Sequence, residues 1–453
     1  MKNKIKTLLY NIFGGDSMKN NLTLGMISLG CEKNRIDTEL FLGVCQKYGI
    51  KITNRISDAN ILVVNTCGFI DSAKKESLDT ILELIDYKEK GKIIIAIGCL
   101  VERYYDFLKQ EIPEVDYYIP IKDYDHIDKV LKEISSKNES FKMDYMNRVL
   151  TTSNHSVYLR IGEGCNNCCT YCAIPLIRGT YRSRNHFEIL SEARNLVSMG
   201  AKEITVIAQD TSKYGTDLQD NYYIHNLLHD ISLIDGVEIV RVLYLYPDEI
   251  TDDLINEVAN NPKIAPYFDI PIQHASDKML VSMNRRGNQE LIRDLVKKIR
   301  SKIPNSIVRT TLITGFPGEN DEDFNILKDF VKEIKFNRLG VFAYSDEEGT
   351  KAYEFNNKVD NEISNTRRDE IIKIQQEISL ELNKQEIGNI YDVIVDNYDY
   401  SKKCYLTRSY AYAPDDADGY IYVYSNSELI IGNIYKVEIT DCDTYELKAK
   451  LVN

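Results

Sequence analysis

The chain lacks any long apolar run. None of its hydrophobic stretches approaches the roughly 18 residues of a membrane-spanning helix. Residues 1–13 are basic with a short Leu8-Leu9-Tyr10 patch, but they lack the apolar core and the small-residue cleavage site of a secretory signal. The sequence therefore predicts a cytoplasmic protein that does not associate with membranes. For residues 1–21 two explanations stay open: a disordered leader, or translation that begins at Met18.

The chain also lacks an excess of positive charge. It has 56 Lys and Arg against 69 Asp and Glu, a formal net charge of −13. Nucleic-acid binders usually carry a basic footprint, so this balance argues against that class, although it permits a local basic groove. An acidic field favours a basic protein partner. The 453 residues suit about three domains of ordinary globular composition.

The first domain is expected at residues 22–135. Short β-branched runs at 24–27, 61–64 and 93–96 are separated by helical patterns. Near-continuous apolar strands separated by helices indicate a parallel sheet that is covered on both faces. A charged, weakly patterned stretch at 132–154 is expected to be a linker.

The second and third domains are expected at residues 150–385 and 386–453. Apolar runs at 157–160, 204–207, 240–244, 268–271, 308–313 and 339–342 alternate with helical segments such as 187–198 and 291–303. This series predicts an α/β fold with a partial or closed barrel, whose loop chemistry lies at the carboxyl ends of the strands. A long helical pattern at 366–385 precedes a Tyr-, Val- and Ile-rich segment with turn signals, which predicts a small all-β module.

The clearest motif lies just after the first barrel strand, where Cys165, Cys169 and Cys172 follow a C-x3-C-x2-C spacing. The cytosol keeps thiols reduced, so metal ligation or catalysis explains such cysteines better than disulfides. Three thiolates on a 4Fe–4S cluster leave one iron open, and that iron can chelate S-adenosylmethionine. A zinc site is the alternative, but two back-to-back C-x2-C pairs lack the spacer of a zinc knuckle. Cys168 is then expected to be a bystander.

A second set consists of Cys31, Cys67 and Cys99, each placed a few residues after one of the N-terminal strands. In a parallel sheet these strand ends share one edge, where ligands bind. The three thiols could converge on a second cluster, or they could be buried small residues. Packing cysteines would fall within strands instead of repeatedly past them beside glycine, so the pattern favours the cluster and leaves the alternative open.

Other candidate ligands are weaker. Cys45, Cys404 and Cys442 show no relation to strand ends and are expected to be packing or surface residues. His225 and His229 are spaced i, i+4 and could ligate a metal on a helix face. No third ligand is evident near them in the sequence, so an ordinary structural role is favoured.

At these residues the sequence resembles the methylthiotransferase family of radical-SAM enzymes, over nearly the whole chain from about residue 22. Both cysteine sets match the family. The resemblance implies an N-terminal α/β domain, a radical-SAM barrel and a C-terminal TRAM β-domain. It also implies two 4Fe–4S clusters, with the auxiliary cluster held by Cys31, Cys67 and Cys99.

Within the family, four segments resemble the branch that modifies an aspartate of a small-subunit ribosomal protein. The branch that modifies a tRNA adenosine usually has Gln-Asn-Val in place of Gln209-Asp210-Thr211, and Gln-Ser-Gly in place of Gln273-His274-Ala275. The four segments are residues 28–34, 65–72, 209–215 and 270–276. The resemblance therefore implies the ribosomal-protein branch. Methylthiolation of tRNA is the alternative, and tRNA is an expected partner only under it.

The resemblance also implies a mechanism with two equivalents of S-adenosylmethionine. One methylates a sulfur at the auxiliary cluster, and the other is cleaved to a 5′-deoxyadenosyl radical that takes a hydrogen from the β-carbon of the aspartate. The substrate radical then collects the methylthio group. A C–H bond of this kind has no acidic proton for general-base chemistry, so a cofactor radical is needed. The cluster electron is expected from a donor such as flavodoxin or ferredoxin.

Residues around the expected pocket are assigned from position. Tyr171 matches the aromatic position that packs on adenine in radical-SAM enzymes, and Gln209 is expected at a strand end that lines the pocket with Asp210 and His274. Gly315 and Gly318 belong to a turn that resembles a cofactor-side turn. A tight turn that needs glycine is an equal explanation for them.

Two charge patterns complete the expectations. Arg178, Arg182 and Arg184 form a basic run that either grips carboxylates or is solvated. Residues 388–453 contain eleven acids and six Lys and Arg. An RNA-binding barrel should present a positive groove, so this module suits a basic ribosomal protein better, unless the charges are simply solvated.

Overall fold

The computed structural model describes residues 22–452 and divides them into two compact units. Residues 22–151 and Ala173–Gly179 form the first unit, and residues 152–172 and 180–452 form the second. The leader expected at residues 1–21 lies outside the described residues. In the part of the chain that is described, no helix is long and apolar enough to cross a membrane.

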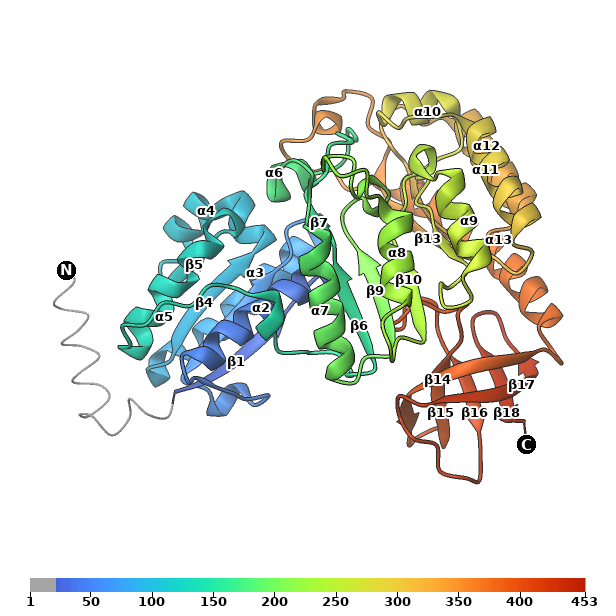
Figure 1. The fold of residues 1–453 in the computed structure, drawn as a ribbon. Coiled ribbons are helices and arrows are strands. Elements are labelled where there is room, and N and C mark those ends of the chain that lie inside the picture. Colours follow the sequence, from blue (N-terminus) through green and yellow to red (C-terminus); the bar gives the residue numbers. More distant parts are fainter. Residues whose placement is uncertain (1–21, 453) are drawn as a thin grey trace. The chain divides into compact units, whose positions relative to one another are not determined.

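The first unit is built on a five-stranded parallel sheet with the order β2-β1-β3-β4-β5. Its strands are β1 (Thr23–Ser28), β2 (Lys51–Ile52), β3 (Ile61–Thr66), β4 (Ile93–Gly98) and β5 (Tyr117–Ile119). Figure 1 labels its strands β1, β4 and β5. The predicted parallel sheet is confirmed, and β1, β3 and β4 contain the three expected runs. This order is doubly wound, and its switch point lies between β1 and β3.

Helices cover both faces of this sheet, as predicted. Side chains alternate along a strand, so Ile61 and Val63 of β3 join one core while Leu62 and Val64 join the other. The first core packs against α2 (Glu32–Lys47) and α5 (Ile127–Ser135), and the second packs against α3 (Asp71–Ile85) and α4 (Cys99–Glu111).

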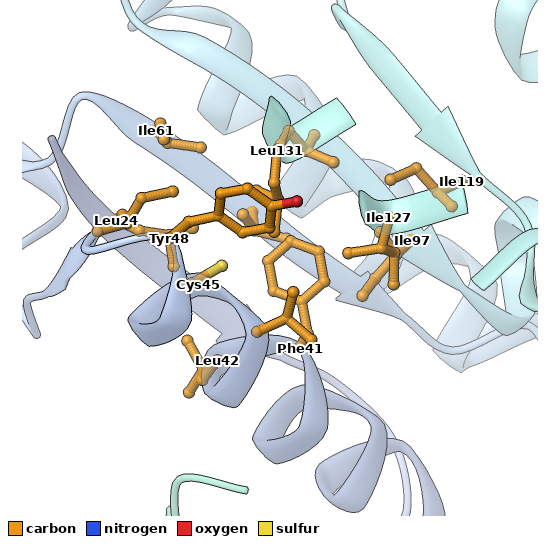
Figure 2. Packing of buried hydrophobic residues seen from close by; sticks show 14 residues of the cluster. Leu24, Phe41, Leu42, Cys45, Tyr48, Ile61, Ile97, Ile119, Ile127 and Leu131 are labelled. Atoms are coloured by element: carbon orange, nitrogen blue, oxygen red, sulfur yellow. The ribbon is translucent and has the colours of Figure 1, made fainter. Parts of the chain in front are cut away.

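Figure 2 shows the first of these cores, where Phe41 and Cys45 of α2, and Tyr48 directly after this helix, lie among aliphatic side chains from the strands and α5. The Tyr48 hydroxyl donates to the Asp128 carboxylate at 2.5 Å, so the ring can be buried without an unsatisfied polar group. The prediction that Cys45 is a packing residue is confirmed.

The expected linker at 132–154 is more ordered than its composition indicates. Its first residues complete α5, and Phe141, Met143 and Val149 pack against the first core. Arg148 is buried and pairs with Glu39 of α2 at 3.4 Å. The sequence could not predict this ion pair, because a charged residue that is buried in a pair and one that is solvated give the same local pattern.

The second unit begins with the partial barrel that was predicted. Strands β6 (Ser156–Arg160), β9 (Glu203–Ile207) and β10 (Ile239–Val242) form one parallel sheet, and β11 (Tyr267–Asp269), β12 (Ile307–Thr314) and β13 (Arg338–Ala343) form the next. A backbone bridge from Val240 to Ile264 links the two. The 240–244 prediction ran too long, because Tyr244 has a φ of +65° and leaves the strand.

Helices follow most of these strands in the expected alternation. They are α7 (His186–Ser198), α8 (Ile224–Ser232), α9 (Asp252–Asn260), α10 (Asp277–Ser282), α11 (Gln289–Lys302) and α12 (Asp321–Ile334). The long helix α13 (Asn361–Gln385) starts five residues before its predicted start at 366. Asp360 caps it by accepting from the Glu362 amide at 2.7 Å, and the polar first turn carries no apolar pattern.

The C-terminal module is a closed β-barrel with the order β14-β15-β16-β18-β17 (Figure 1). Its strands are β14 (Ile390–Asp399), β15 (Cys404–Arg408), β16 (Ile421–Tyr424), β17 (Ile434–Cys442) and β18 (Leu447–Leu451). Closure leaves no exposed sheet edge. The predicted all-β module is confirmed, and so is a packing role for Cys404, which is buried, and Cys442, which contacts the barrel core.

A buried ionic network joins the C-terminal barrel to the central one within the second unit. Glu203 of β9 is fully buried and accepts from Arg408 at 2.7 Å and from Arg241 at 3.1 Å. Burial alone would raise the pKa of Glu203, but Arg408 and Arg241 lower it to about 2. Arg408 also binds Asp396, whose carboxylate lies 2.9 Å from His155.

Candidate metal centres

Cys31, Cys67 and Cys99 lie at the carboxyl edge of the N-terminal sheet, after β1, β3 and β4. Cys31 is the N-cap of α2, Cys67 follows the last residue of β3, and Cys99 is the first residue of α4. Since β1, β3 and β4 are neighbours in the sheet, the three thiols come from adjacent strand ends.

Close backbone approaches bring these cysteines together. A side chain at Gly30, which has a φ of +86°, would place a Cβ 3.0 Å from the Cys67 sulfur. The sulfur of Cys99 lies 3.2 Å from the Asn34 Oδ1 atom in the first turn of α2. The residues on either side of Cys31 therefore lie against both other cysteines, Gly30 against Cys67 and Asn34 against Cys99.

Burial raises the pKa of the Cys99 thiol to about 12, and burial is also the main cause of a raised pKa at Cys67. The Arg178 guanidinium opposes both shifts. It comes from α6 (Ile174–Arg178), which packs against Cys99 through Ala173 and Ile177. Buried thiols that favour a proton in the free protein need a strong metal partner to stay deprotonated.

Gly98 shapes the turn before Cys99, and we expect Gly98→Ala to destabilise the first unit by about 1–3 kcal/mol. Its φ of +100° and ψ of −161° lie in a region that only glycine enters easily, and an added Cβ would lie 2.6 Å from the Thr66 carbonyl oxygen. Urea unfolding would measure the loss.

Gly388→Ala is the matched control for Gly98→Ala. Gly388 has a φ of +89°, but an added Cβ would meet none of the described atoms within 4 Å. An equal loss for the two variants would contradict the steric role of Gly98.

The second set of thiols lies on the loop after β7 (Gly162–Glu163). Cys165, Cys169 and Cys172 are partly buried, while Cys168 is exposed and has a φ of +51°. Backbone and side-chain bonds hold the loop: Thr170 donates to the Met283 carbonyl at 3.0 Å, and the Asn284 amide donates to the Cys168 carbonyl at 3.0 Å. The φ of Cys168 lies in the left-handed region, and its role as a bystander stays a prediction.

Arg285 and Tyr246 enclose Cys169, and the sequence did not point to either. An Arg285 nitrogen lies 3.8 Å from the Cys169 sulfur, and the Tyr246 hydroxyl lies 4.0 Å from it. The Arg285 guanidinium also stacks on the Tyr246 ring at 4.0 Å. Arg285 and Arg286 are adjacent in a loop between helices, and no local pattern indicates that Arg285 contacts a cysteine more than 100 residues earlier.

The thiol of Cys165 has its pKa raised to about 11, mainly by burial and further by Asp210, Cys169 and Cys168. Asp210 is buried and accepts from the Asn167 amide at 2.6 Å, so the end of β9 is tied to the cysteine loop. Gln209 donates to Glu163 at 2.6 Å. These contacts place Gln209 and Asp210 beside the loop, and a cofactor contact by Gln209 stays a prediction.

Among residues 22–452, no group of three or more His, Cys, Asp and Glu side chains is gathered closely enough to hold one metal ion. Around a tetrahedral zinc ion with Zn–S bonds of about 2.3 Å, the sulfurs lie about 3.8 Å apart. In a 4Fe–4S cluster each cysteine binds a different iron, so its sulfurs stand farther apart. Each set offers three thiols, which are the donors that a 4Fe–4S cluster requires.

The turn that contains Gly315 and Gly318 is tight, which supports the explanation that its glycines are needed for backbone geometry. Their φ angles are +73° and +87°, and an added Cβ would collide with Ser364 or Asn357. Glu319 closes the turn by accepting from the Gly315 amide at 3.0 Å. A cofactor contact at Gly315 or Gly318 stays a prediction.

His274 was expected to line the pocket, but its ring is fully buried. Its Nδ1 atom accepts from the backbone amides of Ala275 and Ser276, which leaves Nε2 to donate to Glu319 at 3.3 Å. Tyr171 packs edge-on against Phe316 at 6.4 Å, and its proposed contact with adenine stays a prediction.

The basic run divides into different roles. Arg178 is buried and Arg184 is nearly so, and they pair with Asp37 and Glu192, each at 2.7 Å. For these two arginines the structure supports binding to carboxylates and not solvation. Arg182 is exposed. His229 lies 3.0 Å from Glu257, and His225 stacks against Tyr223.

Three family models match successive parts of the chain. The uncharacterized protein family UPF0004 matches residues 23–120, the radical SAM superfamily matches 159–331, and the TRAM domain matches 387–452. Radical-SAM enzymes use an iron–sulfur cluster and S-adenosylmethionine, so these are the cofactors of the central barrel.

Curated relatives align over nearly their full lengths. The ribosomal protein uS12 methylthiotransferase RimO of Acetivibrio thermocellus is 43% identical over 446 residues, which are 95% of this chain and 98% of the relative. RimO of Clostridium tetani is 45% identical over 432 residues, 93% and 96% of the two chains. This chain belongs to the uS12 methylthiotransferase family. It is accordingly a radical-SAM methylthiotransferase, as the sequence resemblance implied.

Solved structures support the fold of this methylthiotransferase. The radical S-adenosylmethionine methyltransferase TsrM from Kitasatospora setae matches with a TM-score of 0.55 and 11% identity, over 74% of each chain. The cobalamin-dependent S-adenosylmethionine radical enzyme OxsB matches with a TM-score of 0.51 and 12% identity, over 80% of this chain and 56% of that one. At such identities the likeness extends to the fold alone.

Proposed function

We propose that this methylthiotransferase adds a methylthio group to the β-carbon of an aspartate in ribosomal protein uS12. Two equivalents of S-adenosylmethionine serve each turnover, one for the methyl group and one for hydrogen abstraction. The carrying observation is the second set of thiols: Cys31, Cys67 and Cys99 lie on adjacent strand ends and interact electrostatically. A radical-SAM enzyme that only generates radicals needs no such set, whereas sulfur insertion needs a place to hold sulfur.

The donor sets fit two 4Fe–4S clusters. Cys165, Cys169 and Cys172 would hold the first, with the exposed Cys168 as a bystander, and three ligands would leave one iron open for S-adenosylmethionine. Cys31, Cys67 and Cys99 would hold the second. When bound, the first cluster with S-adenosylmethionine supplies the one-electron chemistry that an unactivated C–H bond requires.

The chain's own residues position and shield these thiols. Thr170 and Asn284 hold the backbone of the loop, and Arg285 stacked on Tyr246 covers Cys169 from one side. This cover keeps a cation beside the Cys169 sulfur. Low local dielectric strengthens such contacts and protects reactive species from solvent.

The surface of the C-terminal barrel favours a protein substrate over tRNA. A groove that tracks phosphates needs unpaired positive charge. Four of the barrel lysines instead contact acids within 4 Å, in the pairs Lys402–Glu446, Lys436–Asp392, Lys448–Asp441 and Lys450–Glu438. The surface of the module is less negative than its net charge indicates, however, because three of its acids bind groups of the central barrel: Asp396, Asp415 and Asp418.

The substrate is tested by competition in one anaerobic reaction. The enzyme reconstituted with iron, sulfide, reductant and S-adenosylmethionine receives uS12 and a tRNA anticodon stem at equal concentration. We expect a mass gain of one methylthio group on an aspartate of uS12, located by fragmentation. Two equivalents of S-adenosylmethionine should be consumed per product, one ending as S-adenosylhomocysteine and one as 5′-deoxyadenosine.

Methylthiolation of only the tRNA would overturn the proposal and favour the tRNA alternative. A uS12 variant with its target aspartate changed to asparagine is the matched control. Modification of this variant at the same rate at another residue would exclude aspartate as the target.

A further inference from the structure

We propose that Arg178 is a positioning residue for the N-terminal cluster: it holds the sulfur of Cys99 and raises the reduction potential of the cluster. This inference rests on the proposed assignment of Cys31, Cys67 and Cys99 as cluster ligands. Arg178 lies on α6, the short helix that begins two residues after Cys172 in sequence but belongs to the unit of the other three cysteines.

The geometry of Arg178 points at Cys99. Its Nη2 atom lies 3.5 Å from the Cys99 sulfur and donates to the Asn34 Oδ1 atom at 2.6 Å. Its Nη1 atom lies 2.7 Å from the Asp37 carboxylate. Both side chains of this ion pair are only 2% exposed, so the guanidinium is oriented by a buried carboxylate and directed at the sulfur.

Asn34 makes this arginine necessary once Cys99 loses its proton. The Asn34 amide nitrogen donates to the carbonyls of Leu29 and Thr66 at 3.0 and 2.9 Å, which forces Oδ1 to face Cys99. In the free protein the thiol can donate to this oxygen at 3.2 Å. A ligating thiolate has no proton, so two negative atoms would face each other, and Arg178 is placed to donate to both.

A hydrogen bond from a cation to a cluster sulfur favours the more negative, reduced state of the cluster. Reduction adds one electron and hence one negative charge near the guanidinium. Asp37 neutralises the net charge of the pair, but the positive end of the dipole is the end that faces the sulfur. Removing the pair should therefore make the cluster harder to reduce.

The test uses the full chain with Cys165, Cys169 and Cys172 changed to alanine, so that iron binds only at the N-terminal set. In this background the double variant D37N/R178M removes the ion pair without leaving one buried charge behind. A redox titration followed by electron paramagnetic resonance gives the reduction potential. We expect at least a tenfold shift of the one-electron equilibrium toward the oxidised cluster, about 59 mV more negative.

Two further variants separate this role from a structural one. E39Q/R148M removes another buried ion pair on α2, with its carboxylate two positions along the helix from Asp37 and hence on a different face. It should leave the potential unchanged. R178K keeps a cation, so its reduction potential should lie between those of the parent and D37N/R178M.

Each outcome bears on a different claim. An equal shift in D37N/R178M and E39Q/R148M, or none in D37N/R178M, would overturn the role of Arg178 while leaving the cluster in place. Failure of the parent background to bind iron and sulfide would instead overturn the proposed cluster at Cys31, Cys67 and Cys99. A D37N/R178M protein that loads normally with a shifted potential supports both.

Discussion

We expect that changing Cys165, Cys169 and Cys172 together to alanine removes about four of the roughly eight iron atoms that the two proposed clusters would contain and abolishes reductive cleavage of S-adenosylmethionine. The reason is that the loop then keeps one thiol, Cys168, and a single thiol cannot hold a 4Fe–4S cluster. Iron analysis and the release of 5′-deoxyadenosine under dithionite measure the two losses.

Cys168→Ala is the matched control, because it lies on the same loop and removes one thiol. It should keep the full iron content and the full cleavage rate. Loss of iron in Cys168→Ala, with retention in Cys165→Ala, would mean that the loop uses a different ligand set and would contradict the assignment. Retention of cleavage in the triple variant would contradict the first cluster altogether.

Glu203→Gln is expected to lower the free energy of unfolding of the second unit by about 3–5 kcal/mol at pH 7. The amide cannot compensate Arg408 and Arg241, which are both fully buried beside Glu203. Urea unfolding followed by circular dichroism measures the difference. The surface pair Lys450–Glu438 offers a control, since Glu438→Gln should cost less than about 1 kcal/mol.

The effect of Glu203→Gln also depends on pH in a defined direction. The folded-state pKa of Glu203 is about 2, against 4.5 for a free glutamate. Its contribution is therefore complete above about pH 4.5 and is lost as the pH falls toward 2. From the 1.36 kcal/mol per pKa unit, the contribution falls from about 3 kcal/mol at pH 7 to about 1 at pH 3. A difference between wild type and Glu203→Gln that stays constant over this range would contradict the ionised network.

The organisation of the chain could be predicted from the sequence. Near-continuous apolar runs identified β1, β3 and β4, and the series of strands and helices identified the partial barrel. Both patterns are local, because a strand that is buried on both faces needs apolar side chains at consecutive positions. The positions of Cys31, Cys67 and Cys99 past strand ends were enough to predict that they share one edge.

The partners of charged and polar groups could not be predicted in this way. Arg178 and Arg182 lie four residues apart in one basic run, yet Arg178 is buried against Asp37 and Cys99 while Arg182 is exposed. His274 follows a strand like a pocket residue, but its contacts with Glu319 hold it in the interior. The pairing partner lies tens to hundreds of residues away, so no local pattern encodes it.

The sequence by itself thus determined the three-part α/β architecture, the two sets of cysteines and the family. Those features rest on residue spacing along single elements. Only the tertiary structure decided which cations face the sulfurs, Arg285 at Cys169 and Arg178 at Cys99, and that Glu203 ties the two barrels of the second unit together. These contacts join residues that are far apart in the sequence. A buried charge is stable only where the fold brings an oppositely charged or hydrogen-bonding partner beside it.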